Sequence, residues 1–172
     1  MKTLFKDILN AIATLEDGSG DPLIRYVDWD MGQIDVDPEF MPVSWPCALI
    51  NVSDRDVSNI GENAQMREVL ISIRMAFKVF ERATNLVSGG LLDAALEHMD
   101  KMDEVYKVLS GMEGDSYQKL VCEGTIIEPR PHPRIYTMTF STILSDERDM
   151  KEWLIIPAPS VDVELPVIYK RE

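Results

Sequence analysis

The 172-residue sequence is short of basic residues and of histidine, and each shortage excludes a class of function. It has 17 Lys and Arg against 30 Asp and Glu, which gives a net charge of −13. A surface of this charge repels phosphate, so specific nucleic-acid binding and attachment to anionic membranes are not expected. The two histidines, His98 and His132, have no Cys, Asp or second His at metal-ligand spacing. We therefore expect both to be ordinary surface residues, and we expect no bound metal.

Cysteine and long apolar runs are also scarce. Cys47 and Cys122 each lie in an apolar stretch, which is typical of buried free thiols in a reducing cytoplasm, although a disulfide between them also fits the sequence. No apolar run approaches the ~20 residues of a membrane span. Charged residues recur from Lys2 to Asp7, so the amino terminus does not resemble a signal peptide.

Motifs that carry chemistry are missing as well. The sequence contains no phosphate-binding loop, dinucleotide-binding glycine motif or nucleophile elbow. Residues 28–39 partly imitate a calcium loop, but Gly32 and Gln33 stand where such a loop needs an oxygen ligand and a glycine. Carboxylate pairs suited to glycoside hydrolysis occur in the same segment, as they do in any acidic loop. We therefore predict a protein that is not an enzyme and has no cofactor.

The apolar periodicity predicts two helices. The first begins near residue 4, and its apolar stripe consists of Leu4, Phe5, Ile8, Ile12 and Leu15. The second covers residues 91–110 and ends at Gly111. Its predicted buried stripe consists of Leu92, Ala95, Met99, Met102, Tyr106 and Leu109.

Alternation of period two predicts the strands. It is clearest over residues 67–80, where it places Ile73 in the core and gives a strand long enough to project as half of a hairpin. Further strands are predicted at residues 23–29, 45–52, 119–128 and 135–144. Residues 54–63 have no apolar period and are interpreted as turn-like.

This order of elements predicts an α+β fold. We expect a mostly antiparallel sheet of four to five strands, with two helices packed on one face, in a single domain over residues 1–150. Residues 151–172 are interpreted as an extended carboxyl-terminal arm, because partial alternation there is interrupted by Pro157, Pro159 and Pro166. Such an arm fits either an edge strand on a neighbouring subunit or a tail on its own domain.

The order and pattern of these elements resemble the tail-terminator and tail-completion proteins of long-tailed phages. The resemblance rests on an amphipathic first helix, an acidic segment and a strand that opens with a proline at 46–52. A long alternating strand at 68–80 and the helix at 91–110 follow. Two final strands end in Tyr136-x-x-x-Phe140, with Asp146 soon after.

The resemblance implies a structural virion protein. It would form a six-fold ring that caps the tail tube and joins it to the head–tail connector, and it would need no active site. Its partners would be its own copies, the tail-tube protein and connector or adaptor proteins, with no nucleic acid or membrane. It would be located in the tail or neck of the virion, after synthesis in the cytoplasm of the host bacterium.

A closed ring needs two complementary surfaces on each subunit. Candidate interface residues lie on the long strand and the arm: Arg67, Arg74, Lys78, Trp153, Val161, Val163, Leu165, Val167 and Tyr169. The acidic loop is expected to face the lumen and repel DNA through Asp35, Asp37 and Glu39.

Two other hypotheses remain open. The net charge also suits a small acidic binding module, such as an immunity protein or a nucleic-acid-mimicking inhibitor that covers a basic partner. An enzyme with an unrecognised carboxylate site is the third. Stabilisation by divalent ions, nucleotides or sugars would distinguish it from the other two.

Overall fold

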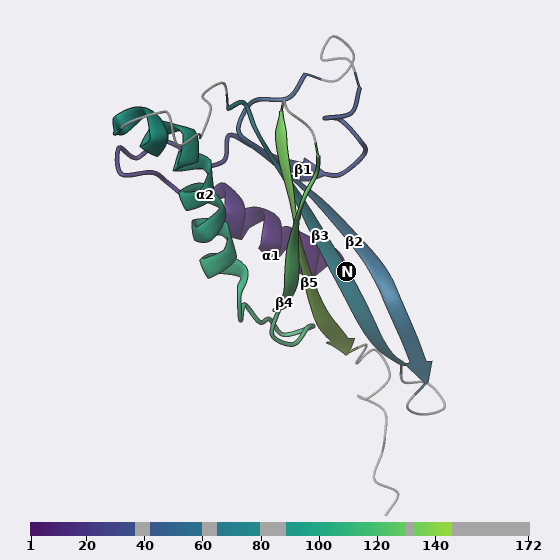
Figure 1. The fold of residues 1–172 in the computed structure, drawn as a ribbon. Helices are drawn as coiled ribbons and strands as arrows, with labels where there is room; N and C mark the ends of the chain where they lie inside the picture. The colour runs from purple at the N-terminus through teal and green to yellow at the C-terminus, as the bar shows by residue number, and fades with distance from the viewer. Residues whose placement is uncertain (37–41, 60–64, 80–88, 130–132, 146–172) are drawn as a thin grey trace, which may run out of the picture.

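The fold is a five-stranded sheet with two helices, seen in a computed structural model that describes residues 1–36, 42–59, 65–79, 89–129 and 133–145. The elements follow the order α1 (Lys2–Ala13), β1 (Tyr26–Trp29), β2 (Cys47–Asn59), β3 (Gln65–Phe77), α2 (Gly90–Leu109), β4 (Val121–Ile127) and β5 (Arg134–Ser145). The strand order across the sheet is β1-β2-β3-β5-β4 (Figure 1).

The predicted α+β class is confirmed. β1 runs parallel to β2, and every other neighbouring pair is antiparallel. Side chains of both helices join one core on a single face of the sheet, which we call the helix face. The proposed arm lies outside the described residues, so the division into a domain and an arm stays a prediction.

The main core lies between the helices and the helix face. α1 contributes Leu4, Ile8 and Ile12, as its stripe predicts, and each is fully buried. Ile73 is fully buried at the centre of β3, which confirms the predicted phase of that strand. The predicted face of β5 is also buried, through Tyr136, Met138, Phe140, Thr142 and Leu144. Each large apolar side chain buried here contributes about 1.5–3 kcal/mol.

The predicted buried stripe of α2 was confirmed at Ala95, Met102 and Leu109 and was wrong at Met99 and Tyr106. Met99 and Tyr106 are both 43% exposed, whereas the buried residues are Ala95, His98, Met102, Val105 and Leu109. His98 was expected at the surface and is only 4% exposed. Its burial is possible because its Nε2 lies 2.7 Å from the hydroxyl of Tyr136 on β5, which supplies a hydrogen-bond partner.

The interpretation of residues 54–63 as turn-like was also wrong within the described part. β2 continues to Asn59, which pairs with Gln65 at the start of β3. Apart from the half-buried Ser58, the side chains of residues 53–58 are exposed, so this half of β2 has no apolar period to reveal it. As predicted from the length of β3, the β2–β3 hairpin projects beyond the helices (Figure 1).

The opposite side of the sheet, the open face, carries a smaller core. Ile34, Cys47, Leu49, Ala76 and Ile135 form it, with Trp45 packed against it. Burial raises the pKa of the Cys47 thiol to about 11, which makes it unreactive at neutral pH. Cys122 is half-buried on the helix face, opposite Phe140, so the two free cysteines lie on opposite faces. Neither described helix has the length and apolarity to cross a bilayer.

Candidate functional site

Arg74 is the centre of a cluster of carboxylates on the open face. It lies near the carboxyl end of β3, and its side chain is 17% exposed. Its Nη1 and Nη2 contact the two carboxylate oxygens of Asp35 at 3.0 and 3.3 Å. Its Nε and Nη2 donate to Oε1 of Glu128 at 3.1 and 3.0 Å, and Nη1 lies 3.4 Å from Asp30. The guanidinium is therefore bound on three sides.

The local structure explains why these carboxylates converge. Asp30 follows β1, and its backbone N–H donates to the carbonyl of Ile50 on β2. Asp35 is held in a turn by a bond from its N–H to the carbonyl of Gly32. Glu128 follows β4, and its N–H donates to the carbonyl of Ile135 on β5. Arg74 thus connects the ends of both edge strands to the central strand.

The electrostatics of the cluster make Arg74 a structural cation. Burial by itself lowers the pKa of Arg74, but hydrogen bonds to Asp35 and Glu128 and the charge of Asp30 outweigh it and raise the pKa above its usual value. Because its donors face carboxylates of the same chain, the guanidinium is not available to bind an external phosphate. No group of three or more His, Cys, Asp or Glu side chains in the described ranges is placed to hold a metal ion.

The projecting end of the β2–β3 hairpin is the second candidate surface. Arg67 pairs with Asp54 on the helix face, with its Nε 3.1 Å from Oδ1. On the open face Arg55 contacts Glu68 at 3.3 Å and also Glu123 of β4. Exposed ion pairs of this kind contribute at most about 1 kcal/mol each. The end of the hairpin is therefore held by its backbone ladder and by charges rather than by a core.

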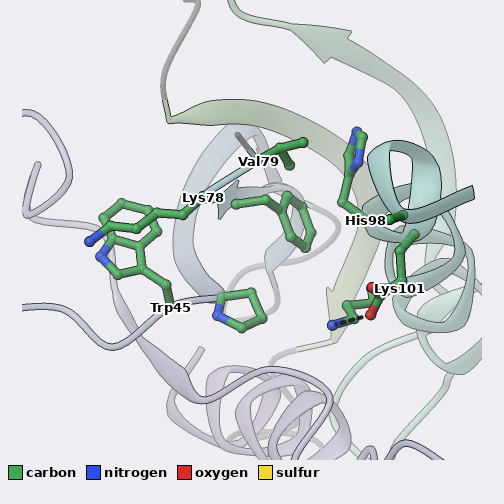
Figure 2. A pocket seen from close by; sticks show the side chains of 9 residues that line it. Trp45, Lys78, Val79, His98 and Lys101 are labelled. Atoms are coloured by element: carbon green, nitrogen blue, oxygen red, sulfur yellow. Dashed lines mark ion pairs between the residues drawn. The ribbon is translucent and has the colours of Figure 1, made fainter. Parts of the chain in front are cut away.

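A pocket of about 280 Å³ lies between the end of β3 and α2. Figure 2 shows Lys78 beside Trp45 on one side and His98 and Lys101 on the other. The Lys78 ammonium lies 5.1 Å from the Trp45 ring, a cation–π distance, and Lys101 pairs with Glu97 at 3.0 Å. Both cations at the mouth of the pocket therefore already have partners.

His98 forms the inner wall of this pocket. Its ring centroid lies 5.6 Å from that of Phe77 and 5.4 Å from that of Tyr136. Burial and the charge of Arg134 lower the pKa of His98 below its usual value, although the backbone of Ala95 favours the charged form. The imidazole is therefore neutral at pH 7, and its place in the aromatic group is structural.

The structure brings together two residues that the sequence assigned to different surfaces. Arg74 was a candidate interface residue and Asp35 a candidate lumen residue, and they bind each other. Arg67 lies on the hairpin, and Lys78 is exposed beside the pocket. The other candidates lie outside the described residues: Asp37, Glu39, Trp153, Val161, Val163, Leu165, Val167 and Tyr169.

The sequence analysis missed the exposed apolar residues of β4. Val121, Ile126 and Ile127 are 60%, 68% and 62% exposed, although they belong to a predicted strand. The signal was present in the segment Val121–Ile127, which ends in two adjacent isoleucines and so cannot bury every apolar side chain on one face. A comparison with protein-family models gives no match to this chain, and a comparison with curated proteins also gives none.

Proposed function

We propose that the chain is a structural ring subunit that closes the end of a phage tail tube and joins it to the head connector. The observation that carries the proposal is the β2–β3 hairpin, which extends beyond the helices as an exposed, paired projection (Figure 1). The outer part of this hairpin, unlike Val52, Val69 and Ile71 nearer the helices, adds nothing to the core of its own domain. It has the shape needed to reach a neighbouring subunit.

Ring closure needs two different surfaces that complement each other, because a head-to-tail interface repeats around the symmetry axis. The hairpin supplies one surface, with Val57 and Met66 exposed near its end. The outer edge of β4, the last strand in the sheet order, has no partner among the described strands and is a further surface for a neighbour. The hairpin and this edge are different surfaces, as a head-to-tail contact requires.

The charge of the open face fits the proposed lumen. Asp30, Asp35 and Glu128 surround a single guanidinium, so the cluster keeps an excess of negative charge. The whole chain has a net charge of −13. Like-charge repulsion would keep DNA from adhering to a passage lined by this face.

The first test is native mass spectrometry with negative-stain imaging, over a concentration series at moderate salt. We expect rings of six subunits with a central hole. The variant Val57→Glu should weaken assembly about tenfold. Its monomer should stay folded, because the new carboxylate lies opposite Arg67 across the hairpin. Leu91→Glu is the control, since Leu91 is also an exposed apolar residue but lies at the start of α2.

The outcome that contradicts the proposal is a strict monomer at every concentration, both alone and with purified tail-tube rings. Equal assembly of Val57→Glu and Leu91→Glu would leave a ring but remove the hairpin from its interface. The two variants must melt at similar temperatures for the comparison to be valid, which circular dichroism checks.

One observation favours the acidic binding module as a second candidate. The solvent side of α2 carries an acidic row on one exposed helix face: Asp93, Glu97, Asp100, Asp103 and Glu104. Such a row complements a basic partner. Replacement of Asp100 and Asp103 by Lys should abolish binding to a basic protein in this case, and should leave ring assembly unchanged if the chain is a tail subunit.

A further inference from the structure

β4 is an edge strand whose outer side is bare. It is last in the sheet order, and no described strand pairs with its outer side. Its exposed apolar residues occupy both faces, with Ile126 on the open face and Ile127 on the helix face, as their pairing with Thr137 and Tyr136 shows. Beyond the register shift between Cys122 and Gly124, an apolar edge without a described partner is a template for a further strand.

The backbone of this edge offers specific donors. The N–H of Glu128 donates to the carbonyl of Ile135 at 3.0 Å, so the N–H of residue 128 points toward β5. Because this direction alternates along a strand, the N–H groups of Thr125 and Ile127 point to the free edge. Natural edges are commonly protected by Lys or Pro, and the segment Val121–Ile127 contains neither.

The sequence contains a segment that suits this edge. Residues 161–169 place Val161, Val163, Leu165, Val167 and Tyr169 at alternate positions, with acidic residues at 162 and 164. This alternation is that of a strand with one apolar face. Pro166 has no N–H and is even-numbered, like the acidic residues 162 and 164. It is therefore tolerated only where the backbone N–H positions of the even-numbered residues point away from the partner strand.

We propose that residues 161–169 of a neighbouring copy add to the free edge of β4 as an antiparallel strand. This inference rests on the proposed ring, because it names a contact between successive subunits in addition to that of the hairpin. With Pro166 directed outward, the N–H groups of Val163 and Leu165 face β4 and meet Thr125 and Ile127. In the antiparallel pairing directly opposed residues share a face, so the apolar side chains of the added strand lie on the helix face.

The chemistry of the two faces supports this orientation. Beside Ile127 on the helix face lie Tyr136 and Met138, which belong to the main core. Beside Ile126 on the open face lie Thr137 and the carboxylate of Glu128. Apolar side chains of the added strand therefore extend the main core on the helix face, whereas parallel addition would place them over the polar face.

The length and composition of the intervening chain favour a neighbour over the same copy. β5 ends at Ser145, which pairs with Met66 near the end of the hairpin, away from the part of β5 that pairs with β4. Residues 146–160 span up to about 50 Å when extended, which is enough to leave the domain. Pro157 and Pro159 restrict the residues before them to extended backbone, which opposes a reversal toward the parent sheet.

The test uses prolines placed by parity in the full-length chain. Ile127→Pro removes an N–H that points to the free edge and spares the ladder with β5, and Ile127→Thr is its control because it keeps the N–H. Val163→Pro removes a donor directed at β4, and Glu164→Pro is its control because that N–H points outward. We expect the first member of each pair to weaken assembly about tenfold, the equivalent of one lost hydrogen bond, and each control to weaken it less.

A mixing experiment then separates a neighbouring copy from the same copy. Ile127→Pro keeps an intact arm and Val163→Pro keeps an intact edge, so an equal mixture should form a one-to-one dimer in native mass spectrometry. Absence of this dimer, or equal assembly of each variant and its control, overturns the inference. If Ile127→Pro still forms rings, the strand addition is wrong but the proposed ring function stands. If the mixture gives the expected dimer while the wild type forms open-ended chains of subunits, the strand addition is supported but the proposed closed ring is wrong.

Discussion

The two edges of the sheet differ in what covers them. On β1, the ring of Trp29 stacks against Phe5 of α1 at 4.7 Å between centroids, and the Tyr26 hydroxyl donates to Asp28. The residue after β1, Asp30, donates its backbone N–H to Ile50 and pairs with Arg74. On β4, every side chain except the half-buried Cys122 is exposed. Among the described residues, the side chains of β1 are largely covered by the domain, whereas those of β4 are exposed.

The difference shows that the exposure of an edge strand depends on its surroundings in the fold and not on its composition alone. β1 has four residues that include Val27 and Trp29, and β4 has seven that include Val121, Ile126 and Ile127. The longer strand is the one whose side chains are exposed. An apolar edge without a described partner is a risk of aggregation for a monomer, and this is the physical reason for the proposed assembly.

The largest expected loss of stability comes from a substitution at the centre of the sheet, which serves as the reference for both edges. Ile73→Asp should prevent folding, because the variant places an unpaired carboxylate at a fully buried position. We expect a loss of at least about 4 kcal/mol, measured by urea denaturation. Ile126→Asp is the matched variant on the bare edge, where the same change should cost less than about 0.5 kcal/mol.

A soluble Ile73→Asp protein with the wild-type melting temperature would show that the core lies elsewhere. A large loss of stability in Ile126→Asp as a monomer would show that the edge of β4 is covered within its own chain. That second result would also remove the basis for strand addition.

Arg74→Met should have the next largest effect, because Arg74 connects the ends of both edge strands. The substitution keeps an unbranched apolar stem but leaves Asp30, Asp35 and Glu128 without their shared cation. We expect a loss of about 2 kcal/mol at neutral pH, with faster amide exchange near Asp30 and Glu128. Arg74→Lys keeps the charge without the forked geometry and should lose about half as much.

Unchanged stability of Arg74→Met would mean that the cluster is solvated and does not contribute to the free energy of unfolding. Faster exchange at Asp30 alone would mean that only the β1 edge depends on it.

A smaller effect should separate the two edges directly. Trp29→Ala removes the stacking against Phe5 and should cost about 1 kcal/mol in the monomer. Ile127→Ala removes an exposed side chain on β4 and should change the stability of the monomer by less than about 0.5 kcal/mol. Thermal unfolding of both variants at low concentration measures the difference, and equal losses would erase the contrast between the edges.

The elements with one buried face could be predicted from the sequence together with their phase, whereas the exposed outer half of β2 could not. α1, β3 and β5 bury a single stripe, so their periodicity reports their structure and even their phase. The outer half of β2 buries nothing, so no period marks it. α2 carries apolar residues on two adjacent stripes, and the choice between them depends on whether His98 finds Tyr136, a contact 38 residues away.

The candidate site was the least predictable part. Arg74 and its carboxylates come from three separate segments, and their meeting depends on strand order and loop conformation. The bare edge of β4 depends on which strand ends the sheet, and the sequence predicted the strand without its position. Local patterns specify faces of elements, whereas neighbours in the sheet are set by the whole chain.

The smallest expected effect concerns pH and should act on the β4 side of the sheet. His98 contacts Tyr136, which pairs with Ile127 of β4, and burial with the charge of Arg134 lowers the pKa of His98 in the folded state. As pH falls below the ordinary value near 6.5, the unfolded state takes up the proton first, so His98 makes stability decline there, whereas above that pH its contribution is complete. Urea denaturation from about pH 7.5 to about pH 5.5 should therefore show a steeper decline in the wild type than in His98→Gln, in which His132 is unchanged. Equal slopes would mean that His98 is solvated in the folded protein. In that case His98 would not make the β4 side of the sheet more sensitive to acid than the β1 side.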